Sequence, residues 1–249
     1  MSARFLGPRK SPTISDVPLD MHGRENAPVL RDLPSHEEII EPGPDVLMAH
    51  SPHDVHCETV RALRTELMLR RESSPDRSDV IVLLSPCGGE GRSLLAAELA
   101  VAFAQSGRAT LLVDADMRYP RQHELFPVDN SEGLAQAIES GASPRLYGVK
   151  HVPRLSVLTS GHVTRNPLEL LSSQRFAALV EEWRQSYAFV VIDTPPVGEF
   201  SDGLAIANVV GRVLTLSRAR RTPFKRMQEM LRRLAATRAQ VLGAVINHF

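Results

Sequence analysis

The stretch "SPCGGEGRSLLAAELA", residues 85–100, has the glycine spacing of a loop that wraps a phosphate, and it runs directly into a helix-forming segment. Gly88, Gly89 and Gly91 allow backbone N–H groups to turn toward one centre, and the helix that begins near Arg92 adds its positive end. The apolar run "VIVLLS" (80–85) before the loop has the composition of a buried strand. This strand, loop and helix together predict a site for an anion.

Apolar segments of strand length alternate with helical segments along the rest of the chain. Further strands are expected at 109–114, 155–161, 188–193, 212–217 and 241–247, and helices through about 106 and near 131–140, 173–186, 203–208 and 222–237. Near-continuous apolar strands separated by helices indicate a mostly parallel sheet that is covered on both faces. The predicted fold class is α/β, with a mostly parallel sheet sandwiched by helices.

The N-terminal part of the chain has a different composition. Prolines recur among charged and small residues through residues 1–54, so we expect a flexible Pro-rich tail there. The segment that follows, "VHCETVRALRTELMLRR", places Val60, Leu63 and Leu67 on one face of an amphipathic helix. We therefore expect a nucleotide-binding domain with an N-terminal helix over residues 55–249.

Composition limits where the protein acts and what it binds. Lysine plus arginine equal aspartate plus glutamate at 29 each, so the global charge gives no reason to expect nucleic-acid binding. The two cysteines make no disulfide framework, and no secretory signal or apolar run of roughly 18–20 residues is present. We expect a cytoplasmic protein that is recruited to the inner face of the membrane only through a partner.

Carboxylates end two of the expected strands, where ligands gather in a parallel sheet. Asp114 and Asp116 close the strand of "LLVDADMRYP", and Asp193 closes that of "VVIDTPP". Taken singly, each fits a helix cap or a loop acceptor as well as a functional role. Together with the glycine loop and Ser93, directly after the basic residue, they match what a magnesium-nucleotide site requires.

With these motifs, the chain from about residue 55 to its end resembles the bacterial tyrosine kinases of capsular and exopolysaccharide synthesis, which are related to the septum-positioning and partitioning ATPases. "SPCGGEGRS" resembles the first phosphate motif of that family, "LLVDADMRYP" its own aspartate motif and "VVIDTPP" its third motif; "NPLELLSSQRF" (166–176) and "DTPPVGEFSDGLAIA" also look like family segments. The resemblance implies a P-loop NTPase of the deviant Walker A type that uses ATP and Mg²⁺.

The resemblance also implies roles for single residues. Asp116 would be the general base that takes the tyrosine proton, with Asp114 and Arg92 as further catalytic residues, although Asp116 could instead pair with Arg118 or cap a turn. Ser93, Asp114 and Asp193 would hold the metal. The expected nucleotide-binding residues are Gly88, Gly89, Glu90, Gly91, Arg92, Ser93, Leu94 and Asn247. For Asn247, an expected base contact, a plain strand-end role explains the residue nearly as well.

A charged stripe lies on the expected N-terminal helix. Glu58, Arg61 and Arg64 follow one another at intervals of three, so they lie along one side of the helix. A solvated ion-pair stripe would explain this pattern. The resemblance favours the E-x-x-R-x-x-R contact through which such kinases meet a neighbouring subunit in a ring, and hence a homo-oligomer.

Two features depart from the family pattern, Arg92 and the end of the chain, and Cys87 differs from the septum-positioning relatives. Arg92 stands where such loops carry lysine, which keeps the charge but presents a wider planar fork. Cys87 stands where the septum-positioning ATPases have an extra lysine, and its place in the loop predicts that thiolate is favoured over thiol. The chain stops at "VINHF" without the family's tyrosine-rich tail, so the protein-tyrosine substrate is expected in trans.

Three functions remain open from the sequence. The first is a tyrosine kinase regulating exopolysaccharide polymerisation and export with a separate membrane activator, a chain-length-determinant or polysaccharide co-polymerase protein; Arg92 would reduce its activity. The second is a nucleotide-binding adaptor or pseudokinase of the same system. The third is a partitioning-type ATPase. Phosphotyrosine formation distinguishes the first from the other two.

Overall fold

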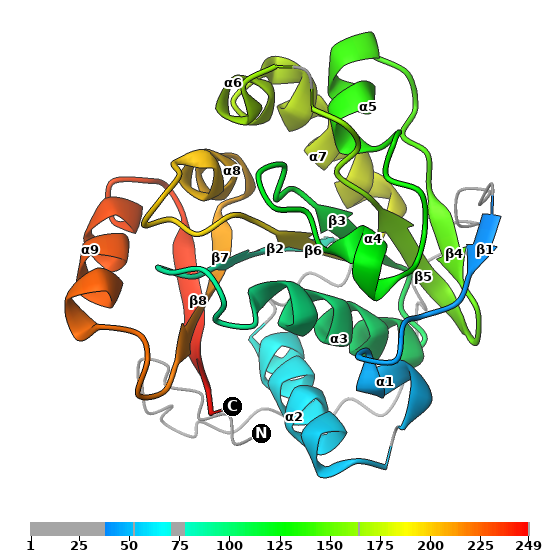
Figure 1. Ribbon diagram of the computed structural model, residues 1–249, viewed down its shortest axis with the longest axis horizontal. Helices are drawn as coiled ribbons and strands as arrows, with labels where there is room; N and C mark the ends of the chain where they lie inside the picture. The colour runs from blue at the N-terminus through cyan, green and yellow to red at the C-terminus, as the bar shows by residue number, and fades with distance from the viewer. Residues whose placement is uncertain (1–37, 52, 71–77, 164, 249) are drawn as a thin grey trace, which may run out of the picture.

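The computed structural model describes residues 38–51, 53–70, 78–163 and 165–248, and their centre is an eight-stranded sheet (Figure 1). Its neighbouring strands run parallel except for the β4–β5 pair, which is antiparallel. In spatial order the strands are β1 (Glu38–Ile40), β4 (Tyr147–Val149), β5 (Val152–Leu158), β3 (Thr110–Asp114), β6 (Phe189–Asp193), β2 (Asp79–Leu84), β7 (Arg212–Arg218) and β8 (Gln240–Asn247). The predicted mostly parallel sheet is confirmed.

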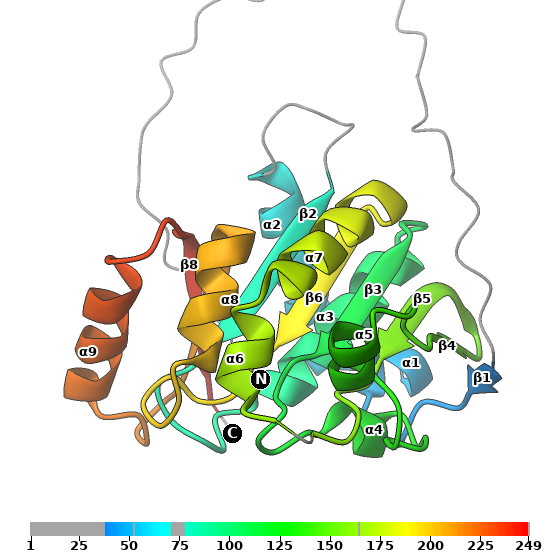
Figure 2. The ribbon, with the colours of Figure 1, turned by 90° about the horizontal axis from the view of Figure 1, so that it is seen from above.

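Helices cover both faces of this sheet (Figures 1 and 2). On one face lie α1 (Leu47–His50), α2 (Val55–Leu69) and α3 (Arg92–Gln105). On the other lie α5 (Leu134–Ser140), α6 (Pro167–Leu171), α7 (Gln174–Ser186), α8 (Asp202–Val210) and α9 (Phe224–Leu234). The short α4 (Gln122–Leu125) follows the loop after β3. Among the helices of the described residues, none combines the length and apolarity of a membrane span.

The strand sequences explain why the sheet has two cores. In β2, Ile81 and Leu83 belong to the core under α3, whereas Val80, Val82 and Leu84 belong to the core under α7 and α8. Successive side chains of a strand point to opposite faces, so a continuous apolar run supplies both cores. This arrangement buries β2 completely and fixes the start of the phosphate loop that follows it.

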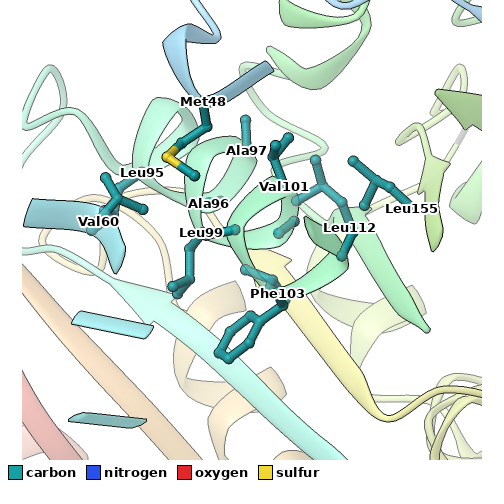
Figure 3. Close-up of a cluster of buried hydrophobic side chains, with 14 of the residues drawn as sticks. Met48, Val60, Leu95, Ala96, Ala97, Leu99, Val101, Phe103, Leu112 and Leu155 are labelled. Carbon is teal, nitrogen blue, oxygen red and sulfur yellow. The ribbon is translucent and has the colours of Figure 1, made fainter. Parts of the chain in front are cut away.

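Helix α3 is the most deeply buried helix next to the site. Apart from its first turn it consists almost wholly of apolar residues, and its alanines at 96, 97 and 100 let the helix approach the strands closely. Figure 3 shows Val101 of this helix beside Leu112 of β3, in a cluster that also contains Leu99 and Phe103. The Phe103 ring stacks on Phe189 of β6 with centroids 3.9 Å apart. This packing holds the first turn of α3 in a fixed position at the carboxyl edge of the sheet.

The predicted tail boundary at residue 54 needs a correction. Residues 1–37 lie outside the described residues, but residues 38–50, also assigned to the tail, form β1 and α1. Val46 and Met48 are fully buried in the α3 core. The buried Glu98 carboxylate of α3 accepts hydrogen bonds from the Leu47 N–H at 2.7 Å and the Met48 N–H at 3.0 Å. An acid on a distant helix thus caps α1, which no local pattern could indicate.

Candidate functional site

The predicted phosphate loop connects β2 to α3 and has the backbone that its glycines suggest. Gly89 (φ +72°) and Gly91 (φ +89°) both adopt the left-handed region, and Gly91 is the N-cap of α3. The loop after β6 packs against it: the Val197 N–H donates to Ser85 O at 2.9 Å and the Gly198 N–H to Pro86 O at 3.0 Å. Gly88 and Gly89 are exposed, so their backbone remains open to a ligand.

Arg92 lies among the predicted acids. Its side chain is only 7% exposed. Nη2 donates to Asp116 Oδ2 at 3.1 Å, Nε to Asp193 Oδ1 at 3.2 Å and Nη1 to Ser85 Oγ at 2.6 Å. The planar fork reaches these three acceptors from three separate nitrogens, whereas a lysine would have to bring all three acceptors to one nitrogen. Arg92, at the position where such loops carry lysine, therefore supplies the positive charge that pairs with the buried carboxylates of Asp116 and Asp193.

Asp116 combines a turn-capping role with an unusual ionisation. Its Oδ1 accepts from the backbone N–H groups of Arg118 (3.2 Å) and Tyr119 (2.9 Å), while Oδ2 faces Arg92. Burial, together with the charge of Asp193, raises the pKa of Asp116 to about 6, against the lowering effect of these amides and of Arg92. The alternative role as a turn cap is thus present, and a base with this pKa is also suited to accept a proton near neutral pH.

Asp114 is committed to the backbone. Its Oδ1 accepts from the Asp116 N–H at 3.1 Å, and Oδ2 accepts from the N–H groups of Arg121 (3.0 Å) and Gln122 (2.9 Å). Burial raises the pKa of Asp114 well above its ordinary value, and the charge of Asp193 adds to this effect. Asp114 thereby fixes the loop that carries Asp116.

Gln122 was not predicted, yet it joins the two predicted metal ligands Ser93 and Asp193. The Nε2 amide of this fully buried residue donates to the Ser93 carbonyl and to Asp193 Oδ2, both at 3.0 Å. A glutamine eight residues after Asp114 carries no recognisable motif. Its role follows from the return of the loop over α3, which the sequence pattern does not specify.

Arg118, the arginine of "DADMRYP", connects the aspartate loop to two other family-like segments, "NPLELLSSQRF" and "DTPPVGEFSDGLAIA". Its guanidinium donates to both oxygens of the buried Asp202 (3.0 and 3.3 Å) and to Asn166 Oδ1 (3.2 Å). Its carbon Cζ lies 4.7 Å above the Phe200 ring. Arg118 therefore anchors the aspartate loop to the starts of α6 and α8, and its side chain does not pair with Asp116.

The other end of the phosphate loop is tied to β8 and to the loop after β7. The buried Asn247 amide donates to Glu90 O at 3.0 Å, and the Glu90 carboxylate accepts from the Thr222 hydroxyl and the Cys87 N–H. Through this bond Asn247 contacts the backbone of the phosphate loop. Burial and the Glu90 carboxylate raise the pKa of the Cys87 thiol, so the predicted preference for thiolate is wrong.

Beside these groups lies a cavity of about 780 Å³, a volume in the range of ligand sites; Asp116 lines it, whereas Asp114, Asp193 and Asn247 do not. The loop residues 88–94 form one side, and Asp116, Tyr119 and Arg121 from the aspartate loop form another. Residues from the N-terminal segment, including Asp45 and Leu47, complete the wall. Loop amides and a buried carboxylate thus face one cavity, as a phosphate and an acceptor hydroxyl would require.

The donor groups fit a magnesium ion that is held mainly by phosphates and water. Over the described residues, no group of three or more His, Cys, Asp and Glu side chains is placed to hold a metal by itself. Mg²⁺ bound with a nucleotide needs only one or two protein oxygens and keeps several waters. Ser93, which lines the cavity, and the fully buried Asp193 carry such oxygens, and within the described part of the chain the buried Oε1 atom of Gln122 has no donor.

Of the three residues of the predicted subunit contact on α2, two form an accessible ion pair and the third contacts α3. Arg61 pairs with Glu58 within the helix, and both side chains are accessible, at 25% and 68%. Arg64 instead turns toward the core, where its Nη1 donates to Ala102 O of α3 at 3.2 Å. The structure therefore brings Glu58 and Arg61 together and assigns Arg64 to the docking of α2 on α3.

Comparisons with known proteins agree with this geometry. The family model "ParA: NUBPL iron-transfer P-loop NTPase" matches residues 76–248. The chain is 34% identical over 206 residues to tyrosine-protein kinase YwqD of Bacillus subtilis (strain 168), covering 82% of this chain and 85% of that protein. It is 32% identical over 204 residues to tyrosine-protein kinase ptk of Acinetobacter johnsonii, covering 81% of this chain but only 27% of that longer protein.

A solved structure shows the same fold. The crystal structure of the chimerical protein CapA2B2 superimposes with a TM-score of 0.77 at 33% identity, covering 87% of this chain and 95% of that one. The likeness thus extends over most of the length of both chains. A P-loop NTPase fold of this kind implies nucleotide binding. The chain belongs to the bacterial tyrosine kinase family, within the ParA-like P-loop NTPases.

Proposed function

We propose that this protein is an ATP- and Mg²⁺-dependent protein-tyrosine kinase that regulates exopolysaccharide polymerisation and export. The observation that carries the proposal is the position of Asp116: the carboxylate lines the same cavity as the phosphate loop, and its pKa is raised to about 6. A partitioning-type ATPase needs to activate water, whereas a kinase needs a base beside an open acceptor site. The names of YwqD and ptk support the same reaction class.

The residues divide the reaction between them. The exposed amides at Gly88 and Gly89 and the start of α3 bind the phosphates. Asp116 accepts the proton of the acceptor tyrosine as the tyrosine oxygen attacks the γ-phosphorus, and the bond from this phosphorus to the bridging oxygen breaks to release ADP. Ser93 and Asp193 would hold the cation, which would neutralise charge on the phosphates. Asp114 and Arg118 keep the aspartate loop in place through the backbone and Asp202.

Arg92 must change partners for this reaction. In the structure the Arg92 guanidinium forms ion pairs with Asp116 and Asp193. A bound nucleotide would attract the guanidinium toward the β- and γ-phosphates, which would also free Asp116 to act as a base. Because this exchange sacrifices two buried ion pairs, we expect phosphoryl transfer to be slower than with lysine.

The protein would act with partners. We propose a chain-length-determinant membrane protein as activator, recruitment to the inner face of the membrane through it, and a tyrosine substrate in trans. The chimerical protein CapA2B2, which has the same fold, supports association with a partner. We also propose a homo-oligomer through Glu58 and Arg61 of α2, and a nucleotide-binding domain whose N-terminal helix carries this contact.

The second candidate is a nucleotide-binding adaptor, which the Arg92 ion pairs favour because they occupy both acids. One experiment distinguishes the two: wild-type protein is incubated with Mg-ATP and the cytoplasmic segment of its co-polymerase, and phosphotyrosine and ADP are measured together. A kinase forms both. ADP without phosphotyrosine would support the ATPase, and nucleotide binding without either product would support the adaptor.

A further inference from the structure

Gln122 contacts the predicted cation site through both its backbone and its side chain. It is the first residue of α4 and is fully buried. Its backbone N–H donates to Asp114, and its side-chain amide donates to Ser93 O and Asp193 Oδ2. One residue thereby touches all three segments that form the predicted metal site.

The orientation of this amide is fixed by chemistry. The Ser93 carbonyl and the Asp193 carboxylate are both acceptors, so only the NH₂ group of Gln122 can face them. The carbonyl oxygen Oε1 must then point elsewhere. It is buried and, within the described part of the chain, has no hydrogen-bond partner. A buried acceptor without a donor costs about 1–3 kcal/mol, so its presence beside a binding site requires an explanation.

We propose that Gln122 is a positioning residue of the cation site. Its NH₂ group holds Asp193 against the first turn of α3, and its free Oε1 accepts a hydrogen bond from a water of the bound Mg²⁺. Magnesium keeps several waters in nucleotide sites, and these waters are donors that seek acceptors. Residues of this kind typically change metal affinity by about 10–100-fold when they are replaced.

This inference rests on the proposed nucleotide site but needs no phosphoryl transfer. The test measures the affinity of a fluorescent ADP analogue in excess Mg²⁺ and in EDTA. For Gln122→Met, which keeps the length but removes donor and acceptor, we expect affinity in Mg²⁺ to fall about tenfold and affinity in EDTA to stay within about twofold. The Mg²⁺ concentration at half-maximal effect should rise by a similar factor.

Two variants keep the test interpretable. Gln122→Asn retains the amide but is too short for both partners, so it should lose Mg²⁺ dependence in the same direction even if Gln122→Met folds poorly. Gln136→Met is the control, because the Gln136 amide also bridges two segments, but its partners are Gly133 N–H and His162 O, whereas the Gln122 amide contacts Ser93 O and Asp193. It should leave both affinities unchanged.

The possible results separate this inference from the kinase proposal. Folded Gln122 variants with wild-type Mg²⁺ dependence, or with equal losses in Mg²⁺ and EDTA, would show that the amide is only structural. A wild-type protein whose nucleotide affinity ignores Mg²⁺ would overturn the inference as well. Mg²⁺-dependent binding that requires Gln122, in a protein that forms no phosphotyrosine, would support the inference and reject the kinase.

Discussion

The Arg92 guanidinium donates to the Asp116 carboxylate across 3.1 Å, from the first turn of α3 to the loop after β3. This ion pair joins the residue that departs from the expected lysine to the residue proposed as the base. Both side chains are almost completely buried, so the pair is shielded from water. The departure at position 92 is therefore coupled to the proposed chemistry through a direct contact.

Replacing Arg92 with lysine should weaken the ion pair with Asp116. A lysine has a single nitrogen with which to reach Asp116, Asp193 and Ser85, so we expect it to hold them less firmly, which makes its charge available to the phosphates and frees Asp116. We expect Arg92→Lys to raise phosphotyrosine formation about tenfold while nucleotide affinity changes by less than about threefold.

The control for this change is Arg121→Lys, because Arg121 also lines the cavity but, among the described residues, forms an exposed ion pair with Glu124 at 2.8 Å. It should have little effect on either quantity. If Arg92→Lys forms phosphotyrosine more slowly than wild type, the phosphate loop has adapted to arginine, and the wild type is a fully active kinase with an altered phosphate loop.

Removing the Arg118 fork should destabilise the aspartate loop. In Arg118→Ala the buried Asp202 carboxylate loses its cation, and Asn166 loses a donor. We expect the free energy of unfolding, measured by urea denaturation, to fall by about 2–3 kcal/mol. The exposed Arg121→Ala should change it by less than about 0.5 kcal/mol. Equal effects of the two variants would contradict an anchoring role for Arg118.

Glu98 should be essential for holding α1 on the core. Glu98→Ala leaves the Leu47 and Met48 N–H groups without their acceptor, so we expect a loss of about 2–3 kcal/mol in the free energy of unfolding. Glu98→Gln keeps one acceptor oxygen and should lose less. The control is Glu66→Ala on α2, an exposed acid 3.9 Å from Arg70, which should be nearly neutral. A neutral Glu98→Ala would show that α1 docks through its apolar side chains alone.

The proposed subunit contact can be tested by exchanging two charges on α2. In the double variant Glu58→Arg with Arg61→Glu the pair within the helix is retained while the surface pattern is reversed. We expect monomer stability within about 0.5 kcal/mol of wild type and loss of higher oligomers in sedimentation velocity with Mg-ATP. Arg64 is left unchanged because it is bound to Ala102 O. If the exchanged variant assembles like wild type, Glu58 and Arg61 form an ordinary solvent-exposed ion pair and no subunit contact.

The sequence predicted those parts of the molecule that depend on local pattern. The central strands, α3 and the positive φ of Gly89 and Gly91 follow from apolar runs and glycine spacing. The antiparallel β4 and the ordered α1 escaped prediction, because three- and four-residue elements carry no measurable period. Their positions depend on partners far along the chain.

The same division holds within the site. Proximity of Asp114, Asp116 and Asp193 follows from parallel strands that end at one edge. The partners of Arg92, the Gln122 amide and the raised Cys87 pKa depend on how loops fold back over α3, so no spacing rule gives them. For Cys87 the general effect of a helix N-terminus is outweighed by burial and by Glu90.

The most direct test of the account is the Asp116→Asn variant, measured for nucleotide affinity and phosphotyrosine formation in parallel with the exposed control Asp129→Asn. The asparagine oxygen can still accept from the amides of Arg118 and Tyr119, so the loop should keep its shape. We predict that Asp116→Asn binds Mg-ATP within about threefold of wild type but forms phosphotyrosine at least about 100-fold more slowly, with Asp129→Asn like wild type. Phosphotyrosine formation by Asp116→Asn at the wild-type rate would contradict the central claim that Asp116 is the base.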